Sequence, residues 1–549
     1  MDYLDNRHAD LCFRTYNIQR RVVRGCPQKS VCGPLLWNIV FDDFLRQDFG
    51  QHHIIAYTDD ALVLFGGRTR ATLEENGNKI LENIILWGTE HKLCFNPMKT
   101  KCIILNKPGN QNLYTRVPTI KMNGNTVKVE KSIKYLGVIL EHRLLWNDHV
   151  SYINDRTGKI FNTFAGIAKR KWGLASEALD IIYRQIFIPI ATYACGSWGH
   201  DVNKIHISRK LIAAQRRALV QITKAYCTTP NASLQVLART PPLPKVVQFY
   251  TKLWYVKWGR NINIKDQTIY ANDFKRPVEF SLTRHPAELI NIHYDTTGNV
   301  DIEIYTDGSK SEAKVGSSFV AFYEGTKIEQ QQFRLGARCS SFQAELFAIR
   351  MAAIWSKNNH PHLRINIITD CASAIASLKK NNLHPLVYDI QNIVNSSSCH
   401  FTITWIKGHQ GHYGNERADT LAKEASNNTE LPIVYNNISI QSIKSSLWED
   451  TIDTWQLDWE NNTSITHQLI PDISKFLTNK WYSPSHKITQ MLSNHGRFFA
   501  YLSRFKGTTS PMCAICDNTD GSIHYIFQCP MLEAERCALK IIAETHIIN

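Results

Sequence analysis

Four carboxylates in the second half of the chain have positions that predict one shared site: Asp307, Glu345, Asp370 and Asp419. Two of them follow predicted strands, and the other two lie on predicted helices. An acid on an inward face is costly to bury unless it is paired or holds a metal. Carboxylate oxygens suit hard cations, and two Mg²⁺ ions roughly 3.5–4 Å apart can activate a water and stabilise a leaving oxygen. The pattern therefore predicts a two-metal nuclease or polymerase site.

Two predicted strands bring Asp307 and Asp370 to the edge of a sheet. The run 302–306 ends in Asp307, and the Asp-Gly-Ser sequence there predicts a tight turn beside the carboxylate. The run 363–369 is apolar enough for a central strand and ends in Asp370.

Two predicted helices bring Glu345 and Asp419. On a helix from 341 to about 356, Glu345 lies four residues before Ile349, on the apolar face. Asp419 lies in the first turns of a helix whose expected N-cap is Asn415. One such acid alone is more often a cap or a surface charge, but the four together favour a metal site.

The order of motifs in residues 301–430 resembles type 1 ribonuclease H. The resemblance rests on Thr306-Asp307-Gly308-Ser309, Ser341-Phe342-Gln343-Ala344-Glu345, Thr369-Asp370 and the run from Trp405 to Asp419. It implies a mixed five-stranded sheet flanked by helices, two bound Mg²⁺ or Mn²⁺ ions, and hydrolysis of the RNA strand of an RNA–DNA hybrid. It also implies that the metal-binding acids are Asp307, Glu345, Asp370 and Asp419.

Two histidines lie in the loop before the last helix of this segment. His409 matches the family's mobile histidine, which assists proton transfer or product release, and an imidazole with its ordinary pKa of about 6.5 suits that task. We interpret His412 as structural. Between Leu378 and Cys399, only Lys379-Lys380 is similar to the basic extension with which some relatives grip the hybrid, so we expect other segments to contribute to substrate binding.

The first part of the chain resembles the reverse transcriptase of jockey-like, non-LTR retrotransposons. The motifs are Arg24-Gly25-Cys26-Pro27-Gln28, Ala56-Tyr57-Thr58-Asp59-Asp60, Asn96-Pro97-Met98-Lys99-Thr100 and Lys134-Tyr135-Leu136-Gly137. Paired aspartates at the tip of a hairpin are typical of two-metal nucleotidyl transfer.

This segment departs from the family in two respects. The family's first catalytic aspartate and its fingers precede the Gly-Cys-Pro-Gln motif, and Asp2, Asp5 and Asp10 have no apolar strand around them. Lys29 stands where the family has glycine. We therefore expect Asp59 and Asp60 to be vestigial. A residual RNA-directed DNA polymerase and a catalytically silent nucleic-acid-binding relic remain the alternatives to a working ribonuclease H.

A cysteine and histidine cluster near the C-terminus has the spacing Cys-x2-Cys-x7-His-x4-Cys, formed by Cys513, Cys516, His524 and Cys529. Three thiolates and one imidazole make a closed tetrahedral set, which predicts one structural zinc ion. The pattern also resembles the zinc knuckle of jockey-like elements. The alternative is a group of buried cysteines near a core histidine.

Composition agrees with a nucleic-acid partner. Among 549 residues, 63 Lys and Arg against 48 Asp and Glu give a net charge of +15, which favours a polyanion. We find no signal peptide and no membrane span in the sequence, and scattered cysteines suggest a reducing, intracellular compartment.

The organisation predicted is a multidomain chain of mixed α/β and α+β class, the C-terminal part of a retrotransposon polyprotein. Its expected segments are a partial reverse transcriptase palm (1–145), a helical thumb or connection (146–265), a linker (266–300), a ribonuclease H domain (301–430) and a helical C-terminal region (431–549) with its knuckle at 513–529.

Overall fold

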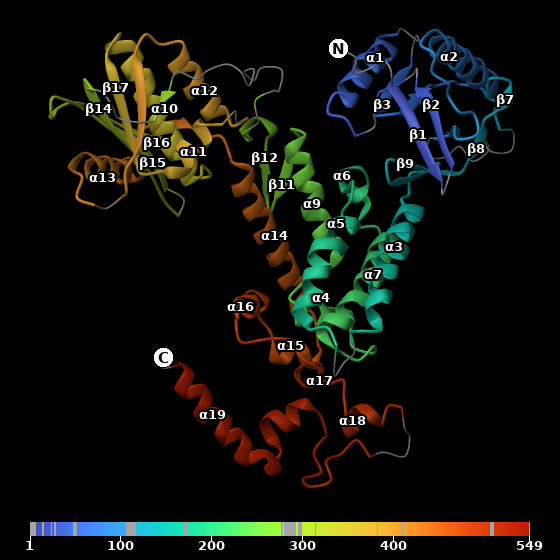
Figure 1. Ribbon diagram of the computed structural model, residues 1–549. Coiled ribbons are helices and arrows are strands. Elements are labelled where there is room, and N and C mark those ends of the chain that lie inside the picture. Colours follow the sequence, from blue (N-terminus) through green and yellow to red (C-terminus); the bar gives the residue numbers. More distant parts are fainter. Residues whose placement is uncertain are drawn as a thin grey trace. The chain divides into compact units, whose positions relative to one another are not determined.

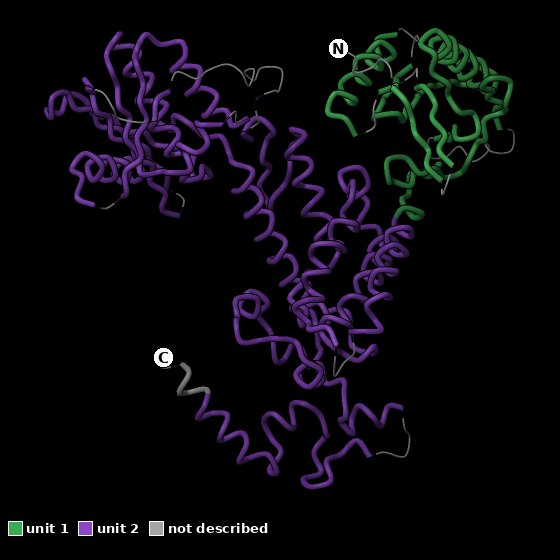
Figure 2. Tube along the Cα trace, in the orientation of Figure 1, with its two compact units in different colours: residues 1–149 green, residues 150–549 purple. Residues whose placement is uncertain are grey.

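The computed structural model describes residues 7–13, 16–22, 25–26, 29–47, 52–105, 117–168, 173–275, 278, 292–294, 299–312, 314–380, 383–408, 410–505 and 510–547. The chain divides into two compact units, residues 1–149 and 150–549 (Figure 2). Each unit has its own core, so each is described by itself.

The described part of the first unit combines two helices with short antiparallel hairpins and one parallel pair of strands. A buried aromatic and aliphatic cluster joins its two helices, α1 (Gly33–Arg46) and α2 (Arg70–Glu90), to the inner face of the hairpin formed by β3 (His53–Tyr57) and β4 (Asp60–Leu64). The other strands are β1 (Arg7–Phe13), β2 (Tyr16–Val22), β5 (Lys101–Ile103), β6 (Lys121–Met122), β7 (Asn125–Thr126), β8 (Lys128–Glu130), β9 (Ser132–Tyr135) and β10 (Val138–Glu141).

The second unit contains a mixed sheet of seven strands in the order β13-β18-β17-β14-β15-β16-β19. Figure 1 labels β14, β15, β16 and β17 of this sheet. Its five longer strands are β14 (Ile302–Ser311), β15 (Lys314–Tyr323), β16 (Thr326–Leu335), β17 (Arg364–Thr369) and β18 (His400–Trp405). β15 is antiparallel to its two neighbours, β14 and β16, and β17 and β18 continue the sheet in parallel with β14.

The expectation of five strands omits the two edges of the sheet. β13 (Ile292–His293) comes from the predicted linker and pairs with β18, and β19 (Ile433–Tyr435) follows the predicted end of the domain and pairs with β16. Strands of two and three residues are too short to show the period-two alternation that marks a strand in a sequence.

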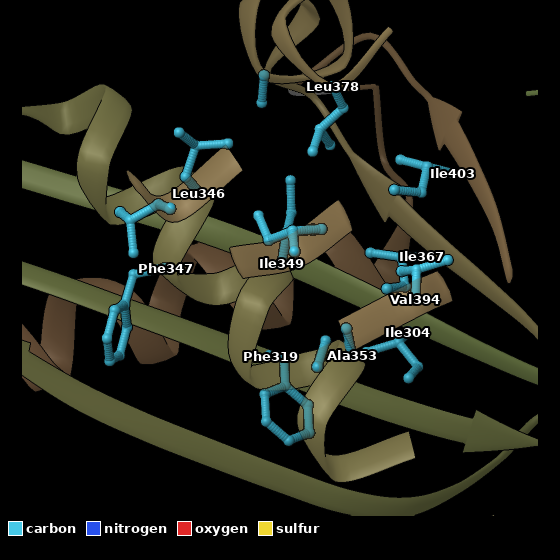
Figure 3. Close-up of a cluster of buried hydrophobic side chains, with 14 of the residues drawn as sticks. Ile304, Phe319, Leu346, Phe347, Ile349, Ala353, Ile367, Leu378, Val394 and Ile403 are labelled. Carbon is cyan, nitrogen blue, oxygen red and sulfur yellow. The ribbon is translucent and has the colours of Figure 1, made fainter. Parts of the chain in front are cut away.

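Helices cover both faces of this sheet. α10 (Ser341–Asn359), α11 (Ala372–Leu378) and α12 (Pro385–Asn395) share one apolar core with the sheet, whereas α13 (Tyr413–Asn427) packs on the opposite face through Ala418 and Leu421. Figure 3 shows side chains of the first core, among them Leu346 and Ile349 of α10 and Ile304 and Ile367 of β14 and β17. Alternate residues of each strand therefore serve opposite layers.

A helical body forms the rest of the second unit. Val236 and Leu237 lie in the same buried cluster as Trp455, Trp459 and Phe476, so segments before and after the sheet share one core. Its helices are α3 (Asn147–Ala165), α4 (Ser176–Ile182), α5 (Ile188–Ala191), α6 (Cys195–Trp198), α7 (Ile205–Thr223), α8 (Asn231–Leu237), α9 (Leu243–Lys257), α14 (Ile440–Glu460), α15 (Ile465–Leu469), α16 (Ile473–Thr478) and α17 (His486–Ser493).

The first residues of the predicted linker are folded. β11 (Ile262–Ile264) and β12 (Gln267–Ile269) form a hairpin whose isoleucines pack with α9 and with Ile443 and Leu447 of α14. The chain ends with α18 (Phe499–Leu502), a short π-helix (His524–Gln528) and α19 (Glu533–Ile547). Among the described helices, none combines the length and the apolar character that crossing a bilayer requires.

Candidate active site and metal centres

Three of the four predicted acids come together at one place. Asp307, Glu345 and Asp370 each offer a carboxylate oxygen, and the three oxygens lie within 4.8 Å of one another. Asp307 and Glu345 are 7% and 8% exposed, and Asp370 is partly buried. Oε2 of Glu345 is buried without a hydrogen-bond partner. Buried carboxylates with an unsatisfied oxygen fit a site for a hard divalent cation.

Asp307 is placed differently from the prediction. β14 continues through Asp307 to Ser311 and remains paired with β15, so the tight turn expected at residues 307–309 is wrong. The parallel pairing of β14 with β17 ends at Thr306 and Thr369. Asp307 is therefore the first residue beyond that pairing, and Asp370 is the first residue beyond β17.

Gly308 allows α10 to approach this strand. A Cβ atom built on Gly308 would overlap the backbone nitrogen of Glu345 and would also meet Ala344. Gly308 is therefore needed for close packing between β14 and α10. In a sequence, a glycine needed for close packing looks the same as a glycine needed in a tight turn.

Burial and like charge both act on the site. Burial, followed by the charges of Asp419 and Asp370, raises the pKa of Asp307 to about 7. Burial, followed by the charges of Asp307 and Asp370, raises the pKa of Glu345 to about 9. Both shifts have the direction expected for carboxylates crowded together in the absence of a cation.

The fourth acid lies beside this group but outside it. Asp419 is on α13, and its Oδ2 accepts a hydrogen bond from Nζ of Lys423, one helical turn later, at 2.6 Å. Its charge contributes to the raised pKa of Asp307. The ion pair with Lys423 is a feature that the i,i+4 spacing in the sequence could have revealed.

The helix carrying Asp419 begins earlier than predicted. His412 occupies the N-cap position without a side-chain cap bond, and Asn415 is buried inside the helix with its Oδ1 unpaired. Asn415 is therefore not the cap. Gly414 lies so close to the ring of Tyr305 that a Cβ there would overlap it, so packing on the sheet fixes the first turn. His409 lies outside the described residues.

The predicted polymerase acids occupy an exposed hairpin tip. β3 and β4 are joined by Thr58 and Asp59, and Asp60 begins β4 opposite Tyr57. Both aspartates are exposed, and in the described part of the chain neither belongs to a group of three or more possible metal ligands. Lys29, where a glycine was expected, has a left-handed φ of 64°.

Comparison with known families gives two matches. Residues 299–427 match the RNase H family, and residues 4–140 match the family described as reverse transcriptase (RNA-dependent DNA polymerase). Related proteins are the putative 115 kDa protein in type-1 retrotransposable element R1DM of Drosophila melanogaster and a retrovirus-related Pol polyprotein from type-1 retrotransposable element R1 of Bradysia coprophila. Each is 26% identical, over 49% and 43% of this chain respectively.

The chain therefore carries a reverse transcriptase domain and a ribonuclease H domain, and its relatives are polyproteins of R1 non-LTR retrotransposons. The matches span 26% and 23% of those two relatives. The crystal structure of RNase H1 from Halobacterium salinarum is similar at 21% identity and a TM-score of 0.20, covering 23% of this chain and 96% of that protein.

Two further residues of the ribonuclease H domain, Trp405 and Gly408, lie against Asp370. Both belong to the predicted motifs, which assign them no role. Nε1 of Trp405 donates a hydrogen bond to the carbonyl of Asp370 at 2.9 Å. Gly408 faces the carboxylate, since a Cβ there would be 2.7 Å from Oδ2 of Asp370. The end of β18 and the residues that follow it therefore pack against Asp370.

The predicted knuckle residues form a second group. Cys513, Cys516, His524 and Cys529 each offer one ligand atom, and all four atoms lie within 4.8 Å of one another. Sγ of Cys516 is 3.3 Å from Nε2 of His524. Backbone hydrogen bonds, first from Ile515, together with His524, lower the pKa of Cys513 to about 7. Three thiolates and one imidazole fit a closed tetrahedral zinc site.

Proposed function

We propose that the ribonuclease H domain hydrolyses the RNA strand of RNA–DNA hybrids with the help of two divalent metal ions. The observation that carries this proposal is the convergence of Asp307, Glu345 and Asp370, two of them buried, with an unpaired oxygen on Glu345. A structural role alone gives no compensation for burying these charges together.

The acids would hold Mg²⁺ or Mn²⁺ in their deprotonated forms. Bound ions supply a water of lowered pKa and stabilise the oxygen that leaves the phosphorus. Asp307 would lose its proton on metal binding, because a cation reverses the effect of the neighbouring carboxylates. Asp419 would complete the set from α13, and His409 would carry a proton to or from the product side.

The direct test uses a labelled hybrid of about 20 base pairs, a length chosen to exceed one turn of duplex. The purified chain is incubated with Mg²⁺, with EDTA, or as the Asp370→Asn variant. We expect cleavage of the RNA strand by the wild type with Mg²⁺ and none in the other two reactions. Glu324→Gln is a matched control, because Glu324 lies in the turn at the opposite end of β14 from Asp307.

The two alternatives give different results. A silent nucleic-acid-binding relic would bind the hybrid and leave it uncut at every Mg²⁺ concentration. A residual RNA-directed DNA polymerase would extend a primer on an RNA template and would lose this activity in an Asp59→Asn and Asp60→Asn double variant. We propose that no extension occurs, which is supported by the isolation of Asp59 and Asp60 from other possible ligands among the described residues.

A further inference from the structure

Two adjacent serines of β15 connect the sheet to both helices that carry predicted acids. Oγ of Ser317 donates a hydrogen bond to the carbonyl of Ala344 at 2.8 Å, and Oγ of Ser318 donates one to the carbonyl of Ala418 at 2.6 Å. Both serines are fully buried. Each acceptor belongs to the residue directly before an acid, Glu345 in the first case and Asp419 in the second.

Strand geometry explains why a pair of neighbours can do this. Successive side chains of a strand point to opposite faces, and α10 and α13 cover opposite faces of this sheet. The two serines also lie beside β14, the strand that carries the third acid, Asp307. Ser318 pairs with Asp307, and Ser317 pairs with Gly308. One dipeptide is therefore bonded, through backbone or side chain, to all three elements.

The contacts are tight on both sides. Gly308 brings α10 against β14, and a Cβ on Gly316 would overlap the carbonyl of Ala422 on α13. With so little space between the layers, a hydroxyl bond to a helix carbonyl fixes how far that helix can slide along the strand. A slide of the helix would move Glu345 or Asp419 relative to Asp307.

We propose that Ser317 and Ser318 are positioning residues that set the places of Glu345 and Asp419 around Asp307 and thereby the affinity of the site for divalent cations. The proposal rests on the proposed metal-dependent function of the same site. Neither serine is expected to touch the metal. Partners that orient ligands typically change metal affinity about 10–100-fold when they are removed.

The test measures Mn²⁺ binding to the full chain from the electron paramagnetic resonance signal of the free ion. Binding that is lost in Asp307→Asn is assigned to this site. We expect Ser317→Ala and Ser318→Ala each to weaken that binding about tenfold. Ser356→Ala is the matched control, because Ser356 is a buried serine of α10 that donates to the carbonyl of Ala352, away from the acids.

Melting temperatures separate positioning from stability. All three alanine variants lose one buried hydroxyl and should melt at lower temperatures, but Ser356→Ala should keep wild-type Mn²⁺ affinity. Wild-type affinity in both Ser317→Ala and Ser318→Ala, or an equal loss in Ser356→Ala, would overturn the proposal. If an alanine variant does not fold, Ser317→Cys or Ser318→Cys replaces it. The thiol has a shape similar to that of the hydroxyl and is a weak hydrogen-bond donor, so the cysteine variant should bind Mn²⁺ more weakly than the wild type.

A double variant and a second readout make the assignment sharper. Ser318→Ala should weaken Mn²⁺ binding less in an Asp419→Asn background than alone, because the serine acts through that acid. In hybrid cleavage, both serine variants should need more Mg²⁺ while the KM for the hybrid stays the same. If the wild type does not cleave, the proposed function fails, and the Mn²⁺ measurement still decides the role of the serines.

Discussion

The Cα atom of Gly308 lies against the backbone nitrogen of Glu345, so closely that a methyl group there would overlap it. This contact joins β14, which carries Asp307, to α10 at Glu345 itself. It also means that the spacing of Asp307 and Glu345 depends on a backbone-to-backbone approach and not on side-chain packing alone.

Gly308→Ala should therefore disrupt both the fold and the site. Overpacking of this kind costs about 1–3 kcal/mol of unfolding free energy. We expect a lower melting temperature and loss of hybrid cleavage. Gly166→Ala is the control, because Gly166 has open space around its Cβ position and a backbone that alanine can adopt. A Gly308→Ala protein as stable and active as the wild type would contradict the close approach.

The contribution of Asp307 and Glu345 to the stability of the metal-free protein should fall as pH rises. Folding raises the pKa of Asp307 to about 7 and that of Glu345 to about 9, whereas unfolded carboxyl groups titrate near 4. Between about pH 4 and 9 these two groups bind more protons in the folded chain than in the unfolded chain, so their contribution to the free energy of unfolding decreases with pH over that range.

Mg²⁺ should oppose this loss, and more strongly at high pH, because metal binding replaces protons. The check is the melting temperature between pH 5 and 9 in EDTA and in Mg²⁺. In EDTA, a rise in pH should lower the melting temperature of the wild type relative to that of Asp307→Asn. An identical slope in the two proteins would show that Asp307 titrates normally.

Zinc should hold the segment around residues 513–529 together. Replacing Cys516 by serine removes one of four ligands, and we expect loss of about one zinc per chain and new protease cleavage in this segment. Zinc content by elemental analysis and limited proteolysis measure the two effects. Cys537→Ser should retain zinc, because Cys537 is exposed and lies outside the ligand set.

The substitution Lys29→Gly should increase the stability of the first unit. Its φ of 64° lies in the left-handed region, where an L side chain costs roughly 1–2 kcal/mol, so Lys29→Gly should stabilise the first unit by about 1 kcal/mol. Urea unfolding of the full chain checks this. Lys79→Gly, the same change in the middle of α2, should instead destabilise by about 1 kcal/mol. A loss of stability in Lys29→Gly would contradict the strain.

The sequence predicted that Asp307, Glu345 and Asp370 lie close together, because these residues are tied to regular elements. Glu345 on a helix face and Asp370 after an apolar strand follow from periodicity, and the order of the elements around them is that of the observed sheet and helices. The role of Gly308 was misjudged because a glycine after an aspartate has the same local signature in a turn and in a close contact.

Features that depend on contacts distant in the sequence could not be predicted. The bonds from Ser317 and Ser318 join residues 27 and 100 positions apart. The edge strands β13 and β19 exist because the sheet offers them partners. The common core of α8 and α14 likewise has no local signal, because its residues come from segments on either side of the ribonuclease H domain.

That common core gives the chain an unusual order of assembly. The helical body is discontinuous, with the ribonuclease H domain inserted between its two halves, and Leu237 meets Tyr482 only after the intervening domain has been synthesised. A nascent chain would thus complete the inserted domain first and leave the apolar face of α8 uncovered until the ribosome has passed the end of α16. Conversely, if a short loop replaced the ribonuclease H domain, the two halves of the helical body would still contain the residues of their common core.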